Sequence, residues 1–267
     1  LGMDKMMTVT NNSNTVPTAL ITGGGRRLGL HLVEFYLSQG WRVIAHYNSK
    51  NELATETQDK YSASGRYIAL QADLTSMVEV AELVAQVIEF LTLQGTELDT
   101  IIHNASCFWP DDHELALTER WQRLTALQAV HVTAPQAITQ GLVCKIKKTG
   151  CIIVMSDIYA DLPNSRFASY CSAKAGLQNL ALSWAQTFAP DVRVNIIQPG
   201  PVKFLPHHSE QYREMVLSQS LLRRELGYEA VQQGITYLMS ATAITGSILK
   251  VDGGRSCINH YEQTFNH

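Results

Sequence analysis

Near the start of the chain an apolar run leads straight into a glycine-rich turn, in the sequence Thr18-Ala19-Leu20-Ile21-Thr22-Gly23-Gly24-Gly25-Arg26-Arg27-Leu28-Gly29. The residues from Leu28 to Ser38 then have the periodicity of an amphipathic helix. A strand that enters a helix through glycines brings free backbone N–H groups and the positive end of the helix dipole to one point, where they attract a pyrophosphate. The stretch therefore predicts a strand, a phosphate loop and a helix.

The same alternation continues along the chain and predicts a parallel sheet built from β-α-β units. We expect about seven strands, at Thr18–Ile21, Arg42–His46, Tyr67–Ala72, Thr100–Asn104, Cys151–Met155, Val192–Gln198 and Ser247–Val251. The expected helices are Leu28–Ser38, Glu52–Ser62, Met77–Leu91, Thr118–Lys147, Ser172–Phe188, Glu210–Glu225 and Glu229–Met239. With no linker or shift in composition, this predicts a single Rossmann-type, doubly wound domain over residues 17–267, with helices on both faces and a disordered leader over residues 1–16.

Composition narrows the class of partner. Hydrophobic residues make up 45% of the 267, charged residues only 17%, and the net charge is −3. The 21 basic residues are scattered among 24 acidic ones, which is unlike a nucleic-acid-binding surface, and no apolar run is long enough to cross a membrane. The five cysteines include no C-x-x-C pair, so we expect a cytoplasmic protein without a metal site, and small molecules or further copies of the chain as partners.

The end of the second expected strand indicates which dinucleotide binds. A site for NAD carries an acidic residue about 20 residues after the glycines, to bind the ribose hydroxyls. Here Tyr47, Asn48 and Ser49 follow the strand, and there is no acidic residue before Glu52. Together with Arg26 this favours a 2′-phosphate and hence NADPH, unless the nearby basic residues are simply solvated.

A tyrosine and a lysine lie four residues apart in Tyr170-Cys171-Ser172-Ala173-Lys174, which places them on one face of a helix. A nearby ammonium favours the phenolate, so we expect Lys174 to lower the pKa of Tyr170 from about 10 and to make it a proton donor. In an arbitrary sequence this spacing is more often an exposed helical pair.

These motifs occur together with Asp73-Leu74, Asn104-Ala105-Ser106, Pro199-Gly200, Thr245-Gly246 and Val251-Asp252-Gly253-Gly254. From Thr18 to Gly254 the chain resembles the short-chain dehydrogenase/reductase family. The resemblance implies a homotetramer that transfers hydride from a nicotinamide cofactor. It places the cofactor on Gly23, Arg26, Arg27, Leu28, Tyr47, Asn48, Ser49, Asp73, Leu74, Asn104, Ala105, Ser106, Tyr170, Lys174, Pro199 and Gly200.

Three departures from the general family pattern resemble its pteridine reductase subgroup. Arg27 stands at the middle glycine of T-G-x-x-x-G-x-G, where it would touch both the cofactor phosphates and the substrate. Asn104-Ala105-Ser106-Cys107-Phe108 resembles the subgroup's N-A-S-x-F segment, which implies that Phe108 stacks on a flat pterin and that Ser106 binds its polar edge.

The third departure is Asp157, which lies 13 residues before Tyr170, where the family usually has a serine that polarises a carbonyl. An ionised carboxylate cannot donate a hydrogen bond to a carbonyl oxygen, so this residue weakens the case for a ketone substrate. It suits a heteroaromatic C=N bond. The alternative is that the neighbouring Ser156 is the family serine.

Within the subgroup, the pieces Thr22–Arg27, His103–Ser106, His131–Pro135 and Asp252–Arg255 resemble the bacterial dihydromonapterin reductases. This implies reduction of a 7,8-dihydropterin by NADPH, with Asp157, Tyr170 and Lys174 as catalytic residues and Arg27, Ser106, Phe108, Asp157 and Tyr170 contacting the substrate. Dihydrobiopterin and, weakly, dihydrofolate are further expected substrates. Two rival hypotheses are a carbonyl reductase that uses Ser156, Tyr170 and Lys174, and a non-catalytic nucleotide-binding protein.

Two features have no firm interpretation from the sequence. His131 stands where the family usually has an asparagine that shapes the proton relay behind the lysine. An equal alternative is that His131 is a buried structural histidine. The adjacent His207 and His208 lack metal-ligand spacing and lie in the segment Pro199–Gln211, where the family keeps a mobile substrate lid.

Overall fold

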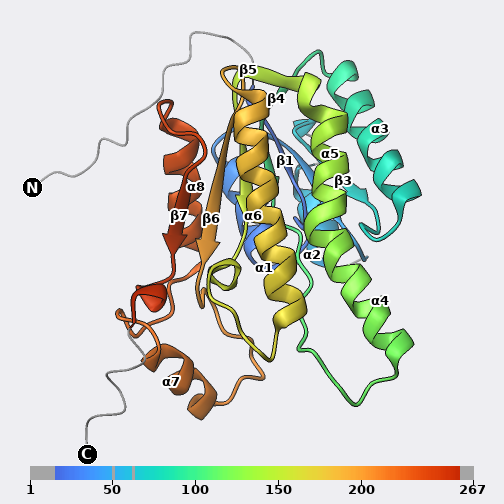
Figure 1. Cartoon of the computed structure of the whole chain (residues 1–267). Coiled ribbons are helices and arrows are strands. Elements are labelled where there is room, and N and C mark those ends of the chain that lie inside the picture. The colour runs from blue at the N-terminus through green and yellow to red at the C-terminus, as the bar shows by residue number, and fades with distance from the viewer. Residues whose placement is uncertain (1–15, 50–51, 62–63, 259–267) are drawn as a thin grey trace, which may run out of the picture.

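A computed structural model describes residues 16–49, 52–61 and 64–258. Its centre is a parallel sheet of seven strands in the order β3-β2-β1-β4-β5-β6-β7 (Figure 1). The strands are β1 (Thr18–Ile21), β2 (Arg42–Tyr47), β3 (Tyr67–Gln71), β4 (Leu98–His103), β5 (Ile146–Met155), β6 (Arg193–Pro199) and β7 (Ile248–Val251). The predicted doubly wound α/β fold is confirmed.

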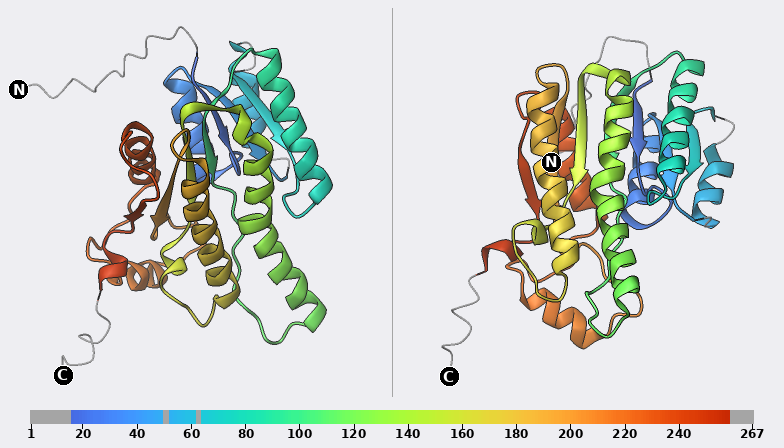
Figure 2. Two further views of the ribbon diagram at one scale, coloured as in Figure 1. Left: turned by 45° about the horizontal axis from the view of Figure 1, so that its top comes forward. Right: turned by 45° about the vertical axis from the view of Figure 1, so that its right-hand side comes forward.

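Helices cover both faces of this sheet (Figure 2). On one side lie α3 (Met77–Leu93), α4 (Leu117–Gln128), α5 (Ala134–Leu142) and α6 (Ala168–Phe188), and on the other α1 (Arg27–Ser38), α2 (Glu52–Tyr61) and α8 (Tyr228–Ser240). The helix α7 (Glu210–Ser218) lies apart from both layers, below the lower ends of the strands in Figure 1.

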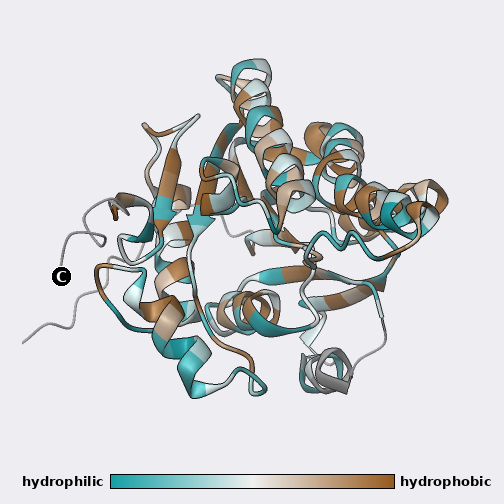
Figure 3. Cartoon of the chain, turned by 60° about the horizontal axis from the view of Figure 1, so that its bottom comes forward, coloured by the Kyte–Doolittle hydropathy of each residue, from teal (hydrophilic) through white to brown (hydrophobic). Residues whose placement is uncertain are grey.

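The core consists of two apolar layers, one on each face of the sheet. Alternate residues of a strand point to opposite faces, so Leu20 of β1 packs in one layer while Ala19 and Ile21 pack in the other. All three are fully buried, and burying one large aliphatic side chain contributes about 1.5–3 kcal/mol. Figure 3 shows the corresponding amphipathic helices, which carry both brown and teal segments.

The sheet order places a crevice between β1 and β4. The chain fills the sheet outward from β1 to β3, then returns to the other side of β1, where Ala19 pairs with Thr100 of β4. Ligands of doubly wound sheets bind at the carboxyl ends of the strands, where the order reverses. The expected phosphate loop follows β1 at this point.

The predicted helix Thr118–Lys147 is wrong as a single element. It divides into α4, a π turn (Ala129–Thr133), α5 and a short 3-10 turn (Val143–Lys145), and β5 then begins at Ile146. The early start of β5 has no strand signal, because polar residues and Gly150 follow Ile146. In the structure this part pairs irregularly with β4, and Thr149 has a φ of +80°. Only the pairing of Leu98 with Ile146 defines that end of the strand.

The predicted helix Glu210–Glu225 is also too long, since α7 ends at Ser218 and Arg223 has a φ of +45°. The other boundaries agree to within a few residues. The expected leader falls outside the described residues apart from Val16. Among the described helices, none is both long enough and apolar enough to span a membrane.

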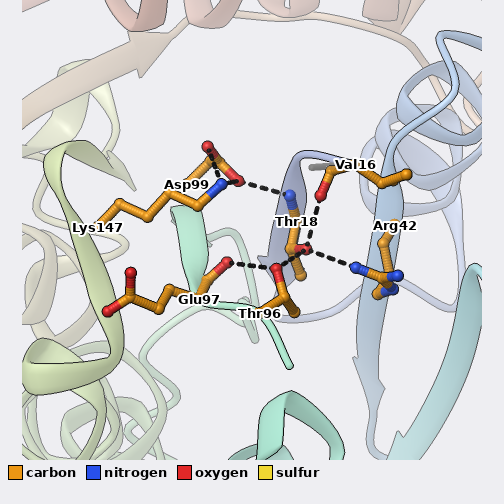
Figure 4. Close-up of polar contacts among 7 residues, drawn as sticks. All are labelled: Val16, Thr18, Arg42, Thr96, Glu97, Asp99 and Lys147. Atoms are coloured by element: carbon orange, nitrogen blue, oxygen red, sulfur yellow. Dashed lines mark hydrogen bonds and ion pairs between the residues drawn. The ribbon is translucent and has the colours of Figure 1, made fainter. Parts of the chain in front are cut away.

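At the amino-terminal ends of the strands, away from the crevice, polar contacts join β1, β2, β4 and β5 (Figure 4). The backbone N–H of Thr18 donates to Asp99 at 2.7 Å, and the Lys147 ammonium donates to both oxygens of the same carboxylate at 2.8 and 2.9 Å. Asp99 thus joins the start of β1 to β4 and β5. Because this contact lies far along the strands from the crevice, it stabilises the sheet without touching the site.

Replacing Asp99 with alanine should lower the free energy of unfolding by about 2 kcal/mol, because a part-buried backbone N–H loses its acceptor and an ammonium loses its partner. Urea denaturation measures this. The matched control is Lys148→Ala, which removes an exposed ion pair with Asp191 and should change stability by less than about 0.5 kcal/mol. Equal effects of the two substitutions would contradict the assignment.

Candidate active site

A cleft of about 770 Å³ opens at the carboxyl ends of the strands. Its lining includes nearly all the predicted site residues, namely Gly23, Arg26, Arg27, Leu28, Tyr47, Asn48, Ser49, Asp73, Leu74, Asn104, Ala105, Ser106, Phe108, Asp157, Tyr170 and Gly200. Two predicted residues are absent from the lining. Pro199 is the last residue of β6, and Lys174 is buried beneath the surface of the cleft.

The glycine loop packs against β4 so closely that side chains are excluded. Gly23 has a φ of +67°, and a Cβ there would lie 2.8 Å from the Cα of Ala105. A Cβ on Gly29 would collide with the carbonyl oxygen of Gly23. Both glycines are therefore required by close approach and, at Gly23, by backbone conformation.

Two neighbouring strands hold the loop in place. The Asn104 amide donates to the carbonyl oxygens of Thr22 and Gly23 at 3.0 and 3.2 Å, and the Thr22 hydroxyl accepts from the N–H groups of Asn104 and Ala105. On the other side, Nδ1 of the buried His46 accepts from the Gly23 N–H at 3.2 Å. Its Nε2 lies 2.9 Å from the carbonyl oxygen of Ala72. Burial lowers the pKa of His46, which keeps the imidazole neutral and Nδ1 free to accept.

The start of α1 suits an anion. Its N-cap residue, Arg26, makes no capping hydrogen bond through its side chain, and no acidic residue lies in the first turn. The Arg26 and Arg27 side chains line the cleft beside the backbone N–H groups of the first turn of α1. An uncapped helix N-terminus flanked by two guanidinium groups fits a pyrophosphate.

Arg27 has a left-handed backbone, with a φ of +52°. A residue with a Cβ pays about 1–2 kcal/mol for this conformation, whereas glycine adopts it freely. This explains why the family pattern has glycine here. The arginine keeps a strained backbone in a loop that faces the cleft, and such strain is typical of functional positions.

Asp157 and Tyr170 form the polar centre of the cleft. The Tyr170 hydroxyl donates to one Asp157 oxygen at 2.9 Å, and the other oxygen accepts from the Tyr159 N–H at 2.9 Å. Ser156 instead points into the protein, where its hydroxyl donates to the carbonyl oxygen of Lys174. Asp157, rather than Ser156, therefore occupies the position beside the tyrosine.

The expectation that Lys174 lowers the pKa of Tyr170 is wrong for this structure. Burial and the adjacent Asp157 raise the Tyr170 pKa well above 10. The Lys174 ammonium lies 5.6 Å from the centre of the Tyr170 ring and donates to the carbonyl oxygen of Met155. Burial lowers the Lys174 pKa to about 8 and raises that of Asp157. Desolvation thus outweighs the attraction between the lysine and the phenolate.

Aromatic rings form one wall of the cleft. Phe108 stacks on Phe167 with ring centres 4.6 Å apart, and its edge meets Tyr170 at 4.7 Å. The ring of Phe108 remains 52% exposed, so part of it is available to a ligand. Since aromatic rings prefer offset stacking, this surface suits a flat ring system.

Several residues of the lining were not among the predicted site residues. Phe204, His208 and Tyr212 reach the cleft from α7 and the segment before it, with neighbouring rings 4.7–6.2 Å apart. Arg255 reaches it from the C-terminal segment and donates to Gln219 at 2.7 Å. His46 is the other omission, because its role depends on a contact with a loop 23 residues away. Across the described residues, no group of three or more His, Cys, Asp or Glu side chains is placed to hold a metal ion.

With this geometry described, comparison with known proteins is informative. A family model described as enoyl-(acyl carrier protein) reductase matches residues 25–256, which is most of the chain. The chain belongs to the short-chain dehydrogenase/reductase family. The family resemblance found in the sequence is thereby confirmed.

Three proteins, one known by sequence and two by solved structure, are similar to this chain over most of its length. Dihydromonapterin reductase of Escherichia coli strain 536 is 30% identical over 240 residues, which cover 88% of this chain and 95% of the relative. The solved structure of FolM, alternative dihydrofolate reductase 1, from Brucella canis in complex with NADP is 26% identical with a TM-score of 0.81, and the match covers 91% and 95% of the two chains. A short-chain dehydrogenase/reductase from Serratia marcescens is 27% identical with a TM-score of 0.79, covering 90% and 98%.

The strained backbone of Arg27 can be tested apart from activity. Arg27→Gly and Arg27→Ala both remove the guanidinium, but only alanine keeps the Cβ that opposes a φ of +52°. We expect the glycine variant to be more stable than the alanine variant by about 1 kcal/mol in urea denaturation. The usual order, with alanine more stable, would show that residue 27 is not left-handed.

Proposed function

We propose that this protein reduces a 7,8-dihydropterin such as dihydromonapterin to the tetrahydropterin with NADPH. The observation that carries the proposal is the hydrogen bond from Tyr170 to Asp157, which places a carboxylate where carbonyl reductases need a donor. The named relatives support it, since one is a dihydromonapterin reductase and another an alternative dihydrofolate reductase complexed with NADP.

The cleft fits NADPH along its length. Gly23, Arg26, Arg27, Leu28 and the uncapped first turn of α1 would hold the pyrophosphate, and Arg26 with Tyr47, Asn48 and Ser49 would hold the 2′-phosphate. Asp73, Leu74, Asn104, Ala105, Pro199 and Gly200 complete the expected binding set. When bound, the reduced nicotinamide supplies the hydride that reaches C6 of the pterin ring.

The chain's own residues position the substrate and manage the proton. Phe108 offers its exposed face to the pterin, and Ser106, Asp157 and Tyr170 bind the polar edge of the ring. By the family resemblance, the proton for N5 would come from water near Arg27. Tyr170, with its raised pKa, stays protonated and keeps Asp157 oriented, while the buried Lys174 supports Tyr170 from below. Fixing the ring and the proton source supplies most of the catalysis.

Three further predictions remain proposals. The family resemblance supports a homotetramer, and the composition supports a cytoplasmic location. The domain is proposed to span residues 17–267, and the single sheet, from Thr18 to Val251, supports one domain over that part.

The substrate site is tested by Phe108→Ala and Asp157→Asn, assayed with dihydromonapterin and NADPH. Loss of the stacking ring should raise KM about tenfold. Replacing the Asp157 carboxylate with the asparagine amide should lower kcat/KM about 10²-fold, because the amide cannot accept and pass a proton as the carboxylate does. The control is Trp121→Ala on α4, which removes an exposed aromatic ring outside the cleft. Unchanged kinetics in both site variants would refute the assignment.

The same assay distinguishes the proposed dihydropterin reductase from the carbonyl reductase hypothesis. Wild-type protein should reduce dihydromonapterin. A 3-oxoacyl thioester or a small ketone should be a poor substrate, because the Asp157 carboxylate stands where a carbonyl needs a donor and Ser156 points into the protein. Preference for the thioester would favour the rival, and Ser156→Ala would then abolish turnover.

Cofactor choice is tested at Arg26. Arg26 is the N-cap residue of α1, and it lines the cleft together with Asn48 and Ser49. We expect Arg26→Ala to reduce the preference for NADPH over NADH about tenfold, measured as the ratio of kcat/KM values. The exposed Arg224, outside the cleft, serves as the control. An unchanged ratio in Arg26→Ala would place the 2′-phosphate elsewhere.

A further inference from the structure

His131 lies directly behind the cleft, in the π turn between α4 and α5. Its side chain is fully buried, and its ring meets the Tyr170 ring edge-on with centres 5.5 Å apart. The proposed mechanism gives this residue no role. A buried imidazole must still satisfy both of its nitrogens, and those partners define what it does.

The two partners fix the tautomer of His131. Nδ1 lies 3.0 Å from the carbonyl oxygen of Leu127, which can only accept, so Nδ1 carries the hydrogen. Burial and the positive charge of Lys174 lower the His131 pKa to about 2, so the ring is neutral. Nε2 therefore carries a lone pair and must accept a hydrogen bond.

The group that faces Nε2 is the Ser106 hydroxyl, at 2.9 Å. Because Nε2 can only accept, Ser106 must donate, and its single proton is directed away from the cleft. Ser106 itself is exposed on the cleft side. It therefore presents only oxygen lone pairs to a ligand.

A competing arrangement directs the Ser106 proton to the nearby Tyr170 oxygen instead. That arrangement leaves Nε2 of a fully buried ring without a donor, which carries the desolvation penalty of an unpaired group. The Tyr170 oxygen lines the open cleft, where water or a ligand can supply a donor in its place. Donation to His131 is therefore favoured.

The Tyr170 proton is also committed, since it points to Asp157. Ser106, Tyr170 and Asp157 thus offer a group of acceptors and no free donor. Such a surface binds N–H groups and repels carbonyl oxygens. A site built to accept a hydrogen bond from a ligand N–H discriminates against a ligand that lacks this group, because the acceptor is then left unpaired.

We propose that His131 is a positioning residue that holds Ser106 as a hydrogen-bond acceptor, and that this makes the cleft select flat rings with an exocyclic amino group facing Ser106. The choice of a 2-amino-4-oxo ring as the ligand rests on the proposed function. The orientation of the Ser106 proton does not.

The first test needs no substrate. Imidazole ¹⁵N NMR on the wild-type protein, with His131 assigned by comparison with His131→Gln, should show Nδ1 protonated and Nε2 unprotonated from pH 5 to 8. In Ser106→Ala the His131 Nε2 resonance should shift, because its donor is gone. A protonated Nε2, or a ring that titrates in this range, would overturn the proposal.

The second test measures selectivity by binding to the NADP-saturated protein. The probes are pterin and 4-hydroxypteridine, which lacks the 2-amino group. Wild type should bind pterin about tenfold more tightly. His131→Phe and Ser106→Ala should each reduce this ratio to about twofold or less, and the double variant should show no further loss.

Two variants separate positioning from mere packing. His131→Gln can accept from Ser106 through its amide oxygen and donate to Leu127, so it should retain the preference for pterin. His103→Gln removes another buried imidazole, one bonded to Thr139 outside the cleft, and should retain it too. A tenfold preference that survives in His131→Phe would overturn the proposal.

The outcomes distinguish this inference from the proposed function. A wild-type protein that reduces dihydromonapterin but binds the two probes equally overturns the selectivity role alone. A protein that reduces no dihydropterin overturns the proposed function, and the NMR experiment still decides the tautomer and the direction of the Ser106 proton.

Discussion

The close contact between the glycine loop and β4 is the constraint on which the cleft depends. Gly23 touches Ala105 with no room for a side chain, and Asn104 and Thr22 bond the two segments to each other. This contact fixes where α1 begins and therefore where its uncapped N–H groups point. It also places Ser106 and Phe108, which come shortly after Asn104 in the chain, on the lining of the same cleft. The proposed pyrophosphate site and the proposed ring site are thus built by one junction between the segments that follow β1 and β4.

The sequence predicts this junction well because its signals are local. Apolar runs, glycines at a strand end and the four-residue spacing of Tyr170 and Lys174 are all decided by neighbours in the chain. The elements that were wrong depend on distant contacts. The start of β5 is defined by one pairing with Leu98, and α7 ends where the following segment packs on the C-terminal Gly253 and Gly254. His46, Phe204 and Arg255 were missed for the same reason, since each reaches the cleft from a segment remote in sequence.

The mistaken pKa expectation for Tyr170 shows how burial changes a sequence argument. On an exposed helix a lysine four residues away would stabilise the phenolate. Here both side chains are buried, and the nearest charge to the Tyr170 hydroxyl is the Asp157 carboxylate rather than the ammonium. Tyr170 therefore stays protonated, and together with Asp157 it forms a surface of hydrogen-bond acceptors. That surface matches the N–H-rich edge of a pterin better than the oxygen of a ketone.

The central claim is that NADPH delivers hydride to the ring carbon of a dihydropterin held on Phe108. The most direct measurement is the position of the label after reduction of dihydromonapterin with NADPH deuterated at the transferred position of C4. The proposed reaction leaves one deuterium in each product molecule, located at C6 by NMR. Product without deuterium at C6, or oxidation of NADPH only by carbonyl substrates, would contradict it.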